Sequence, residues 1–298
     1  MRPILVVALV ALALLRPAVA QSWEIPAGVK TLTVNGYPMA FQERGSGPSI
    51  VFVHGALSDY RSWGAQVAAP PAGYRVIAVS LRHYYPEKWT GKGGNFSTTQ
   101  HADDLIKFIE QLGTGPVHLV GHSRGGIVAA LAAKTRPDLV SKLVLMEPGF
   151  VALAREANPQ GQQSIVAALR EAKASFERGD IEGGLMAFAD RDLPGSWVQM
   201  DEEEKTRRRD NAWTLIELGA SAPVTCEVLA SLTMPVLLMQ GEASPRRYQE
   251  IVRAAEKCLL PATRATIPGA GHAMHRMNPV AFQSELIKFL SRAGPTRQ

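Results

Sequence analysis

The sequence is poor in cysteine. Its 298 residues include only Cys226 and Cys258, both in the C-terminal part. Neither has a second ligand at the spacing of a metal site, so the sequence predicts no metal centre. In an oxidising compartment the two would form a disulfide, which stabilises a fold by about 3–4 kcal/mol for a loop of this length; the alternative is two buried free thiols.

The sequence also lacks any concentration of charge of one sign. The formal net charge is +5. Lys and Arg form no basic stripe and no cluster interleaved with aromatic residues, which argues against nucleic-acid binding. The run at residues 201–209 has its carboxylates first and its cations later. This order favours a solvated helix start, because it complements the helix dipole.

The apolar run at the N-terminus is too short to span a bilayer comfortably. It extends from Ile4 to Leu15, after Arg2 and before the sequence Ala18-Val19-Ala20. These three parts are typical of a secretory signal peptide, here residues 1–20. We therefore expect export to a periplasm or beyond, with no stable membrane insertion after signal removal. Arg16 leaves an uncleaved anchor as the alternative.

Short apolar runs alternate with helical patterns along the rest of the chain, without internal repeats. Residues 30–34 and 37–42, around the turn Asn35-Gly36, predict a hairpin. The alternation predicts an α/β fold with a mainly parallel, doubly wound sheet. The predicted buried strands cover residues 49–53, 75–81, 117–120, 142–147, 235–240 and 264–267, and the predicted helices cover 97–112, 124–134, 246–258 and 279–291.

One long segment breaks this alternation. Residues 159–222 are polar, rich in Ala, Glu, Arg and Lys, and show no buried-strand pattern. We interpret residues of about 150–225 as a helical cap inserted into a domain that covers residues 21–298. The apolar and aromatic residues from Leu185 to Trp197 and near Trp213 would form either a pocket lid or the core of the cap.

The most specific motif is the pentapeptide Gly121-His122-Ser123-Arg124-Gly125. It lies between an apolar strand and an alanine-rich helical pattern, the context in which Gly-x-Ser-x-Gly indicates a nucleophile. A serine in such a tight reversal presents its hydroxyl above the sheet edge. Its neighbours two positions away must then be nearly free of side chain. The following helix directs backbone N–H groups at the same spot.

A nucleophilic serine needs a base. His272 lies in a glycine-rich loop after the last predicted strand and before the last helix, a position that suits a side chain reaching over a distant serine. His275 is the nearest rival. His118 lies within a predicted buried strand and is interpreted as a core histidine.

The order of these parts resembles the α/β-hydrolase superfamily over essentially all of the chain after residue 20. The resemblance rests on the strand ending in His54-Gly55, the Ser123 turn, the helical insertion and the late His272. It implies an oxyanion hole formed by the backbone N–H groups of Ala56 and Arg124, and such donors are worth a few kcal/mol each.

A catalytic serine and its base also need a carboxylate that orients the base, which completes a triad. This acid is not in its usual place. The superfamily usually carries it three residues after the glycine that follows strand 235–240, and here that position is Ser244. Glu147, at the end of the preceding strand, corresponds to the acid position of haloalkane dehalogenases and some lactonases of the superfamily. Glu242 lies in the usual loop but two positions early. We favour Glu147 and keep Glu242 as the alternative.

The nucleophile position holds serine, which argues against the alkyl-enzyme chemistry of the dehalogenase and epoxide-hydrolase branches. The expected function is hydrolysis of a small or medium carboxylic ester, or a lactone, without a metal or organic cofactor. Within enzymes the alternatives are an amide or C–C bond hydrolase and an acyltransferase. A non-catalytic small-molecule receptor is the alternative from another class, because fold alone does not select the function.

Overall fold

The computed structural model describes residues 23–153, 159–191, 193–216, 222–259 and 261–292. They form one eight-stranded sheet in the order β1-β2-β4-β3-β5-β6-β7-β8. β1 and β2 form the predicted hairpin, β2 also pairs antiparallel with β4, and all the other neighbours are parallel. The predicted fold class is therefore confirmed. The strands are β1 (Lys30–Val34), β2 (Tyr37–Gly45), β3 (Ser49–Val53), β4 (Arg75–Val79), β5 (Val117–His122), β6 (Val140–Met146), β7 (Val236–Gly241) and β8 (Thr263–Ile267).

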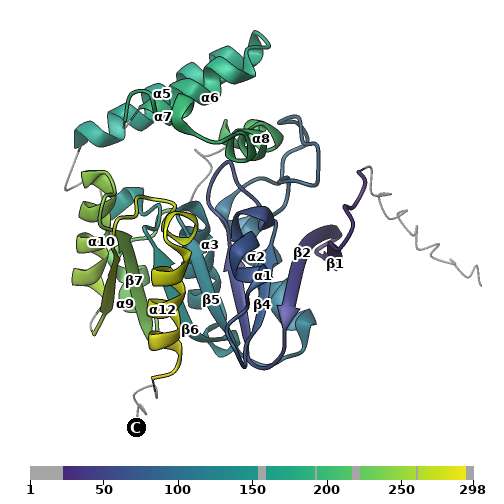
Figure 1. Cartoon of the computed structure of the whole chain (residues 1–298), viewed down its shortest axis with the longest axis vertical. Helices are drawn as coiled ribbons and strands as arrows, with labels where there is room; N and C mark the ends of the chain where they lie inside the picture. Colours follow the sequence, from purple (N-terminus) through teal and green to yellow (C-terminus); the bar gives the residue numbers. More distant parts are fainter. Residues whose placement is uncertain (1–22, 154–158, 192, 217–221, 260, 293–298) are drawn as a thin grey trace, which may run out of the picture.

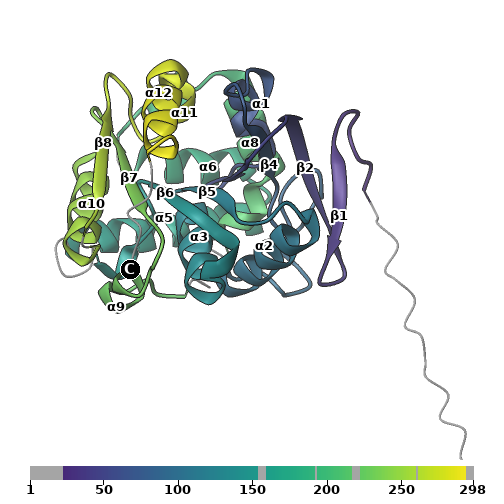
Figure 2. The same ribbon diagram turned by 90° about the horizontal axis from the view of Figure 1, so that it is seen from below.

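Helices cover both faces of this sheet (Figures 1 and 2). One face buries a cluster that includes Val53, Leu119 and Leu143, and the other buries Phe52, Val120 and Val144. Alternate residues of each strand thus enter different cores, as a doubly wound sheet requires. The first face is covered by α2 (Thr98–Leu112), α3 (Arg124–Thr135), α9 (Cys226–Ala230) and α10 (Arg246–Cys258), and the second by α1 (Gly64–Ala68), α11 (Met274–Met277) and α12 (Pro279–Leu290).

A group of helices lies above the carboxyl ends of the strands (Figure 1). It lies between β6 and β7 in sequence, within the segment interpreted as a cap, and is called the cap below. Its elements are α5 (Pro159–Glu177), α6 (Ile181–Asp190), α7 (Ser196–Gln199), α8 (Glu202–Asp210) and the 3-10 turn η3 (Ala212–Leu215). Leu185, Phe188 and Trp197 lie in the cap's own apolar cluster, so these residues serve as cap core. Leu57, from the loop after β3, is buried in the same cluster.

Two local predictions need correction. The strand predicted over residues 75–81 ends at Val79, because the Leu81 N–H donates to His54 Nε2 (3.0 Å) instead of to a neighbouring strand. The helix start predicted as solvated is α8, and it has the expected charge order. However, Arg207 in it is only 2% exposed, with Nη2 3.2 Å from Glu204 Oε2. One side of α8 is therefore buried against the rest of the protein.

The two cysteines are joined in the structure. Cys226 at the start of α9 and Cys258 at the end of α10 form a disulfide. The predicted signal peptide, residues 1–20, lies outside the described residues. Within the described ranges, no helix is both long and apolar enough to cross a membrane.

Candidate active site

Ser123 lies at the turn between β5 and α3 in a strained backbone conformation. Its φ is 52° and its ψ −118°, a region that residues with a side chain rarely adopt. Hydrogen bonds hold the turn: the Ser123 N–H donates to Met146 O, and the Ser123 carbonyl accepts from Gly126 and Gly149 N–H, all at 2.9 Å. The surrounding fold thus fixes the serine in place.

The glycines of the motif are required by close backbone contacts. A Cβ on Gly121 would lie 2.5 Å from the Gly125 carbonyl oxygen, and a Cβ on Gly125 would lie 2.4 Å from the His54 carbonyl oxygen. The second contact presses the start of α3 against the end of β3. The positions predicted to be nearly free of side chain are those where a side chain would collide with backbone.

Glu147 follows β6 directly and is the carboxylate that the structure brings to His272. Its Oε2 lies 2.7 Å from His272 Nδ1, and its Oε1 accepts from the Gly241 N–H at 2.8 Å. The side chain is fully buried, and the backbone φ of 39° is again in the left-handed region. Burial raises the pKa of Glu147, while the Ser244 hydroxyl and the Gly241 N–H lower it. Ser244, at the superfamily's usual acid position, is buried, and its hydroxyl favours the ionised form of Glu147.

His272 lies in the loop between β8 and α11. Besides Glu147, it contacts two further residues: its carbonyl oxygen is 2.9 Å from His122 Nε2, and its ring stacks on Tyr248 with centroids 3.8 Å apart. Burial lowers the pKa of His272 well below its usual value, and Arg247, Arg191 and Arg208 lower it further. The imidazole is therefore neutral near pH 7, the state that a general base needs.

The Glu242 side chain is turned away from Glu147 and His272. Its Oε2 accepts from the Gly269 N–H at 2.8 Å, and the residue is exposed. The structure thus brings Glu147, the favoured candidate, to His272 and leaves the alternative in contact with the loop backbone.

His122, which directly precedes Ser123, contacts His272. The His122 and His272 ring centroids are 4.6 Å apart, and His122 precedes Ser123 in the chain. In the described part of the chain no hydrogen bond joins the Ser123 hydroxyl to the His272 imidazole. Catalytic hydrogen bonds are often long before substrate binds.

The other histidines named from the sequence have packing contacts. His275 is buried, with its ring centroid 4.2 Å from that of Trp63. His118 Nδ1 lies 3.0 Å from Ser141 Oγ. Neither of these contacts is to a carboxylate, whereas the imidazole of His272 contacts the carboxylate of Glu147.

The two residues named for the oxyanion hole flank the serine. Arg124 is the first residue of α3, so its N–H is at the helix N-terminus. Ala56 follows Gly55, where an added Cβ would lie 3.1 Å from Ser123 Cβ. The Arg124 side chain is buried, with Cζ 4.8 Å from the Phe96 ring centroid, and burial lowers its pKa.

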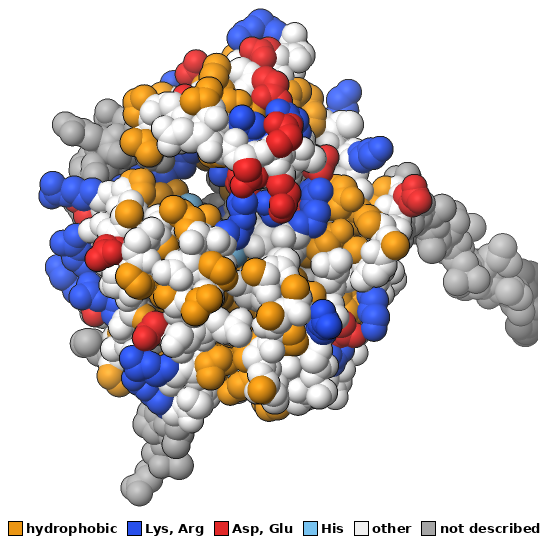
Figure 3. Space-filling view, viewed as in Figure 1, with side chains coloured by type: hydrophobic (Ala, Val, Ile, Leu, Met, Phe, Trp, Pro, Cys, Tyr) orange, Lys and Arg blue, Asp and Glu red, His pale blue; other side chains and the backbone are white. Residues whose placement is uncertain are grey.

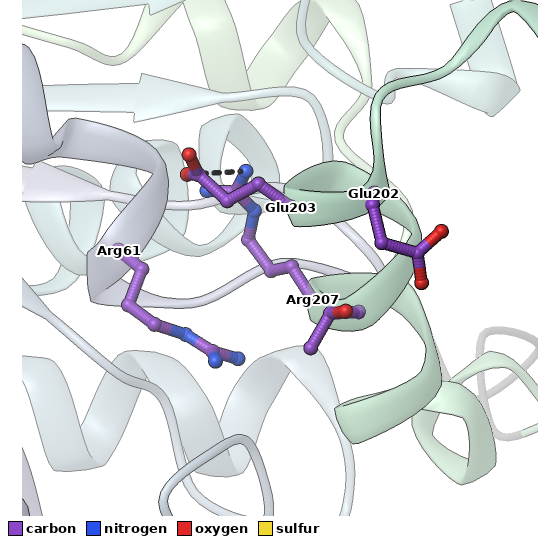
Figure 4. Close-up of a pocket in the computed structure, with 5 residues that line it drawn as sticks. Arg61, Glu202, Glu203 and Arg207 are labelled. Carbon is purple, nitrogen blue, oxygen red and sulfur yellow. Dashed lines mark hydrogen bonds and ion pairs between the residues drawn. The ribbon is translucent and has the colours of Figure 1, made fainter.

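A cavity of about 300 Å³ lies between α8 and the 3-10 turn η1 (Tyr60–Trp63). Figure 4 shows Arg61 opposite the α8 residues Glu203 and Arg207, which form an ion pair. The residues that line this cavity are Arg61, Glu202, Glu203, Thr206 and Arg207. None of the three proposed catalytic side chains is among them.

Several neighbours of the site were not found from the sequence. They are Leu57, Tyr248 and the three arginines that act on His272, namely Arg191, Arg208 and Arg247. Of these, only Arg247 and Tyr248 had a signal in the sequence. They follow directly after the loop at the end of β7, where the superfamily usually carries its acid.

Comparison with known proteins places this chain in a family. The model of the "Alpha/beta hydrolase family" matches residues 50–282. "Esterase Rv0045c" of Mycobacterium tuberculosis is 30% identical over 208 residues, which cover 67% of this chain and 68% of that protein. "Epoxide hydrolase 2" of Siraitia grosvenorii is 33% identical over 122 residues, 41% of this chain. The chain spans only 39% of that relative's length.

A solved structure has a similar fold. A thermophilic esterase from Thermogutta terrifontis, solved with malate bound, superposes with a TM-score of 0.71 at 23% identity. The superposition covers 89% of this chain and 98% of that one. At this identity the likeness shows the fold alone.

Proposed function

The chain belongs to the alpha/beta hydrolase family, and from this premise we propose that it is a serine hydrolase that cleaves a small or medium carboxylic ester, or a lactone. The observation that carries the proposal is the 2.7 Å contact between His272 Nδ1 and the buried Glu147 carboxylate. A buried carboxylate in this contact orients the imidazole and stabilises the imidazolium that forms.

The first half of the reaction forms an acyl-enzyme. Ser123 Oγ attacks the carbonyl carbon while His272 Nε2 takes the serine proton, so that the imidazolium is held by Glu147 through its Nδ1–H. The carbonyl oxygen becomes an oxyanion, which accepts hydrogen bonds from the N–H groups of Ala56 and Arg124. When the intermediate collapses, the bond to the leaving oxygen breaks and His272 returns the proton to that oxygen.

The second half repeats these steps with water. His272 takes a proton from water, the hydroxide adds to the acyl carbon, and the bond to Ser123 Oγ breaks as the proton returns to the serine. The products are a carboxylic acid and an alcohol, or a hydroxy acid from a lactone. Each step uses only groups of this chain and water, so the proposal includes no metal or organic cofactor.

Serine at the nucleophile position also separates this proposal from epoxide opening. That reaction proceeds in this superfamily through an alkyl-enzyme on aspartate, whereas the strained turn here holds Ser123. We accordingly propose an ester or lactone substrate, although one relative is named as an epoxide hydrolase.

We further propose that the protein is exported to a periplasm or beyond. The proposal rests on the signal-like sequence of residues 1–20. The Cys226–Cys258 disulfide supports it, since disulfides persist in oxidising compartments.

A fluorophosphonate probe and a panel of p-nitrophenyl esters, lactones and aryl amides test the function. We expect the probe to label the protein and Ser123→Ala to abolish both labelling and ester hydrolysis. Ser291→Ala, at an exposed serine that ends α12, is the matched control and should keep both. A folded protein that neither reacts with the probe nor hydrolyses any substrate would favour the receptor, and cleavage of aryl amides alone would favour an amidase.

A further inference from the structure

Asn211 is a cap residue that is buried against the ends of two strands of the sheet. It lies between α8 and η3 and is 1% exposed. Its Nδ2 donates to Asp59 Oδ2 at 2.7 Å, and its Oδ1 accepts from the Tyr85 N–H at 2.8 Å. Asp59 lies in the loop after β3 and Tyr85 in the loop after β4, and these two strands are parallel neighbours. One amide side chain therefore joins the cap to two loops of the sheet-bearing body.

The Asn211 amide fits this place in one orientation only. Besides its bond to Asp59, Nδ2 donates to the Arg207 carbonyl oxygen at 2.8 Å. An amide turned over would place its oxygen against these two acceptors and its NH2 group against the Tyr85 N–H. Buried polar groups that face like partners lose their hydrogen bonds at a cost in free energy. The position therefore requires both a donor and an acceptor in a fixed direction.

The Asp59 carboxylate is held from the body and from the cap. It is fully buried and accepts from Arg61 at three atoms: from the backbone N–H and Nε at 2.9 Å, and from Nη2 at 2.7 Å. Asp210, the cap residue before Asn211, pairs with Arg61 Nη1 at 2.8 Å. A buried carboxylate is costly to leave without its hydrogen bonds. Loss of the Asn211 donor would therefore disturb the loop that carries Asp59.

This loop also contains Ala56, the proposed oxyanion donor. Before Ala56, a Cβ on Gly55 would lie 3.1 Å from Ser123 Cβ, so the chain there is packed on the serine turn. After Ala56, Leu57 is 1% exposed within the cap cluster and has a φ of 55°, a region that residues with a Cβ rarely adopt. The Ala56 peptide thus lies between a contact with the serine turn and contacts with the cap.

The place of the cap depends on such contacts. Figure 3 shows the molecule hollowed between the cap and the sheet-bearing body. Packing does not hold two parts together across a hollow, so the buried hydrogen bonds at the end of α8 contribute directly to the position of the cap. Catalytic groups in turn are sensitive to small displacements, because a misplacement of about 1 Å can cost about 100-fold in rate.

Building on the proposed function, in which Ala56 donates to the oxyanion, we propose that Asn211 is a positioning residue for the reaction. Through its hydrogen bond to Asp59 it sets the loop after β3, and with it the direction of the Ala56 N–H. Asn211 contacts no reacting atom in this proposal. The cap thereby contributes to stabilisation of the transition state.

The test measures Asn211→Ala with p-nitrophenyl valerate and with the inhibitor pentyl trifluoromethyl ketone. Ser123 Oγ adds to the carbon of this ketone as His272 takes the proton, and the ketone oxygen becomes an oxyanion. We expect Asn211→Ala to lower kcat/KM by about 10–100-fold and to raise the inhibition constant of the ketone by a similar factor. Rates are normalised to the sites that a fluorophosphonate titrates. A purely structural role would reduce the number of active sites and leave the inhibition constant of the remaining sites unchanged.

Two further variants complete the test. Asp59→Asn breaks the same hydrogen bond from the other side with a side chain of equal size, and it should have the same effect on both measurements. Ser196→Ala is the matched control, because the Ser196 hydroxyl bonds only within the cap among the described residues, to Ala189 O and Asp190 Oδ1. It should change neither kcat/KM nor the inhibition constant.

An active wild type whose ketone inhibition constant is unchanged in Asn211→Ala and in Asp59→Asn would overturn the positioning role and leave the hydrolase intact. An equal rise in Ser196→Ala would overturn it too, because any loosening of the cap would then suffice. A folded wild type that neither hydrolyses the ester nor reacts with the fluorophosphonate would instead refute the proposed function, and the positioning role with it.

Discussion

The Nδ1 atom of His272 lies 2.7 Å from Oε2 of Glu147, and this carboxylate comes from the end of β6 although the superfamily usually takes it from the loop after β7. The serine at the usual position, Ser244, lowers the pKa of Glu147. In our proposal the orienting carboxylate thus comes from the end of the strand before the usual one, and Glu147 contacts His272 from there.

Replacing Glu147 by Gln should lower kcat by about 10²–10⁴-fold, because an amide neither fixes the tautomer of His272 nor stabilises its imidazolium. Glu242→Gln is the matched control and should keep nearly full activity, since the exposed Glu242 carboxylate accepts from the Gly269 N–H and not from His272. Steady-state kinetics on one ester measures both. Full activity in Glu147→Gln would show that the acid is elsewhere.

The pH dependence of kcat/KM should have its acid limb below pH 6.5. His272 acts as a base only when neutral, and burial with three arginines lowers its pKa. Activity should therefore persist as the pH falls below 6.5 and decline only at more acidic pH. The apparent pKa of this acid limb is a property of Glu147 and His272 together, because the two groups are in contact and the pKa of Glu147 is raised.

Arg208→Gln should move that limb to higher pH. Removing one positive charge near His272 makes protonation of the imidazole easier and raises its pKa. Arg209→Gln is the control, because Arg209 pairs with Glu182 and Glu202 instead. An unchanged or more acidic limb in Arg208→Gln would contradict the electrostatic account.

The contact of Leu57 with the cap predicts that cap packing affects the reaction rate. Leu57 has a φ of 55° and follows Ala56, whose N–H is a proposed oxyanion donor. Leu57→Ala should destabilise the protein by about 2–5 kcal/mol, as buried Leu→Ala changes do, and should also lower kcat. Leu185→Ala removes a buried leucine of the same cluster and should destabilise similarly with a smaller effect on kcat. Equal kcat losses would mean that Leu57 acts only through stability.

Opening the Cys226–Cys258 disulfide should lower the free energy of unfolding by about 3–4 kcal/mol, given a sequence separation of 32 residues. Denaturant unfolding of the oxidised protein and of the Cys226→Ser/Cys258→Ser double variant measures the difference. Alkylation before and after reduction gives the matched check. Two alkylatable thiols in the unreduced protein would contradict the bond.

The sheet was predictable from the sequence because its central strands are buried on both faces and appear as continuous apolar runs, as in residues 49–53. Helix α10 was also placed correctly, at residues 246–258. The burial of Arg207 was not predictable. The charge order of α8 complements the helix dipole whether the helix is exposed to solvent or packed on the protein. It therefore does not predict which side of α8 is buried.

The site was only partly predictable. The turn around Ser123 and the loop of His272 have local motifs, and both residues are where those motifs indicated. The choice between Glu147 and Glu242 depended on the directions of two side chains, which chain order does not determine. Arg191, Arg208 and Arg247 lie in or beside ordinary helices, and no local motif marks their electrostatic effect on His272.

The measurement that tests the central claim most directly is trapping of the acyl-enzyme. The protein is mixed with a p-nitrophenyl ester, quenched in acid within the first turnovers, and analysed by intact mass and peptide mapping. We predict a mass increase equal to the acyl group on the peptide that contains Ser123, and no increase in Ser123→Ala. Ester turnover with no acyl group on Ser123, or an acyl group on another residue, would contradict the account.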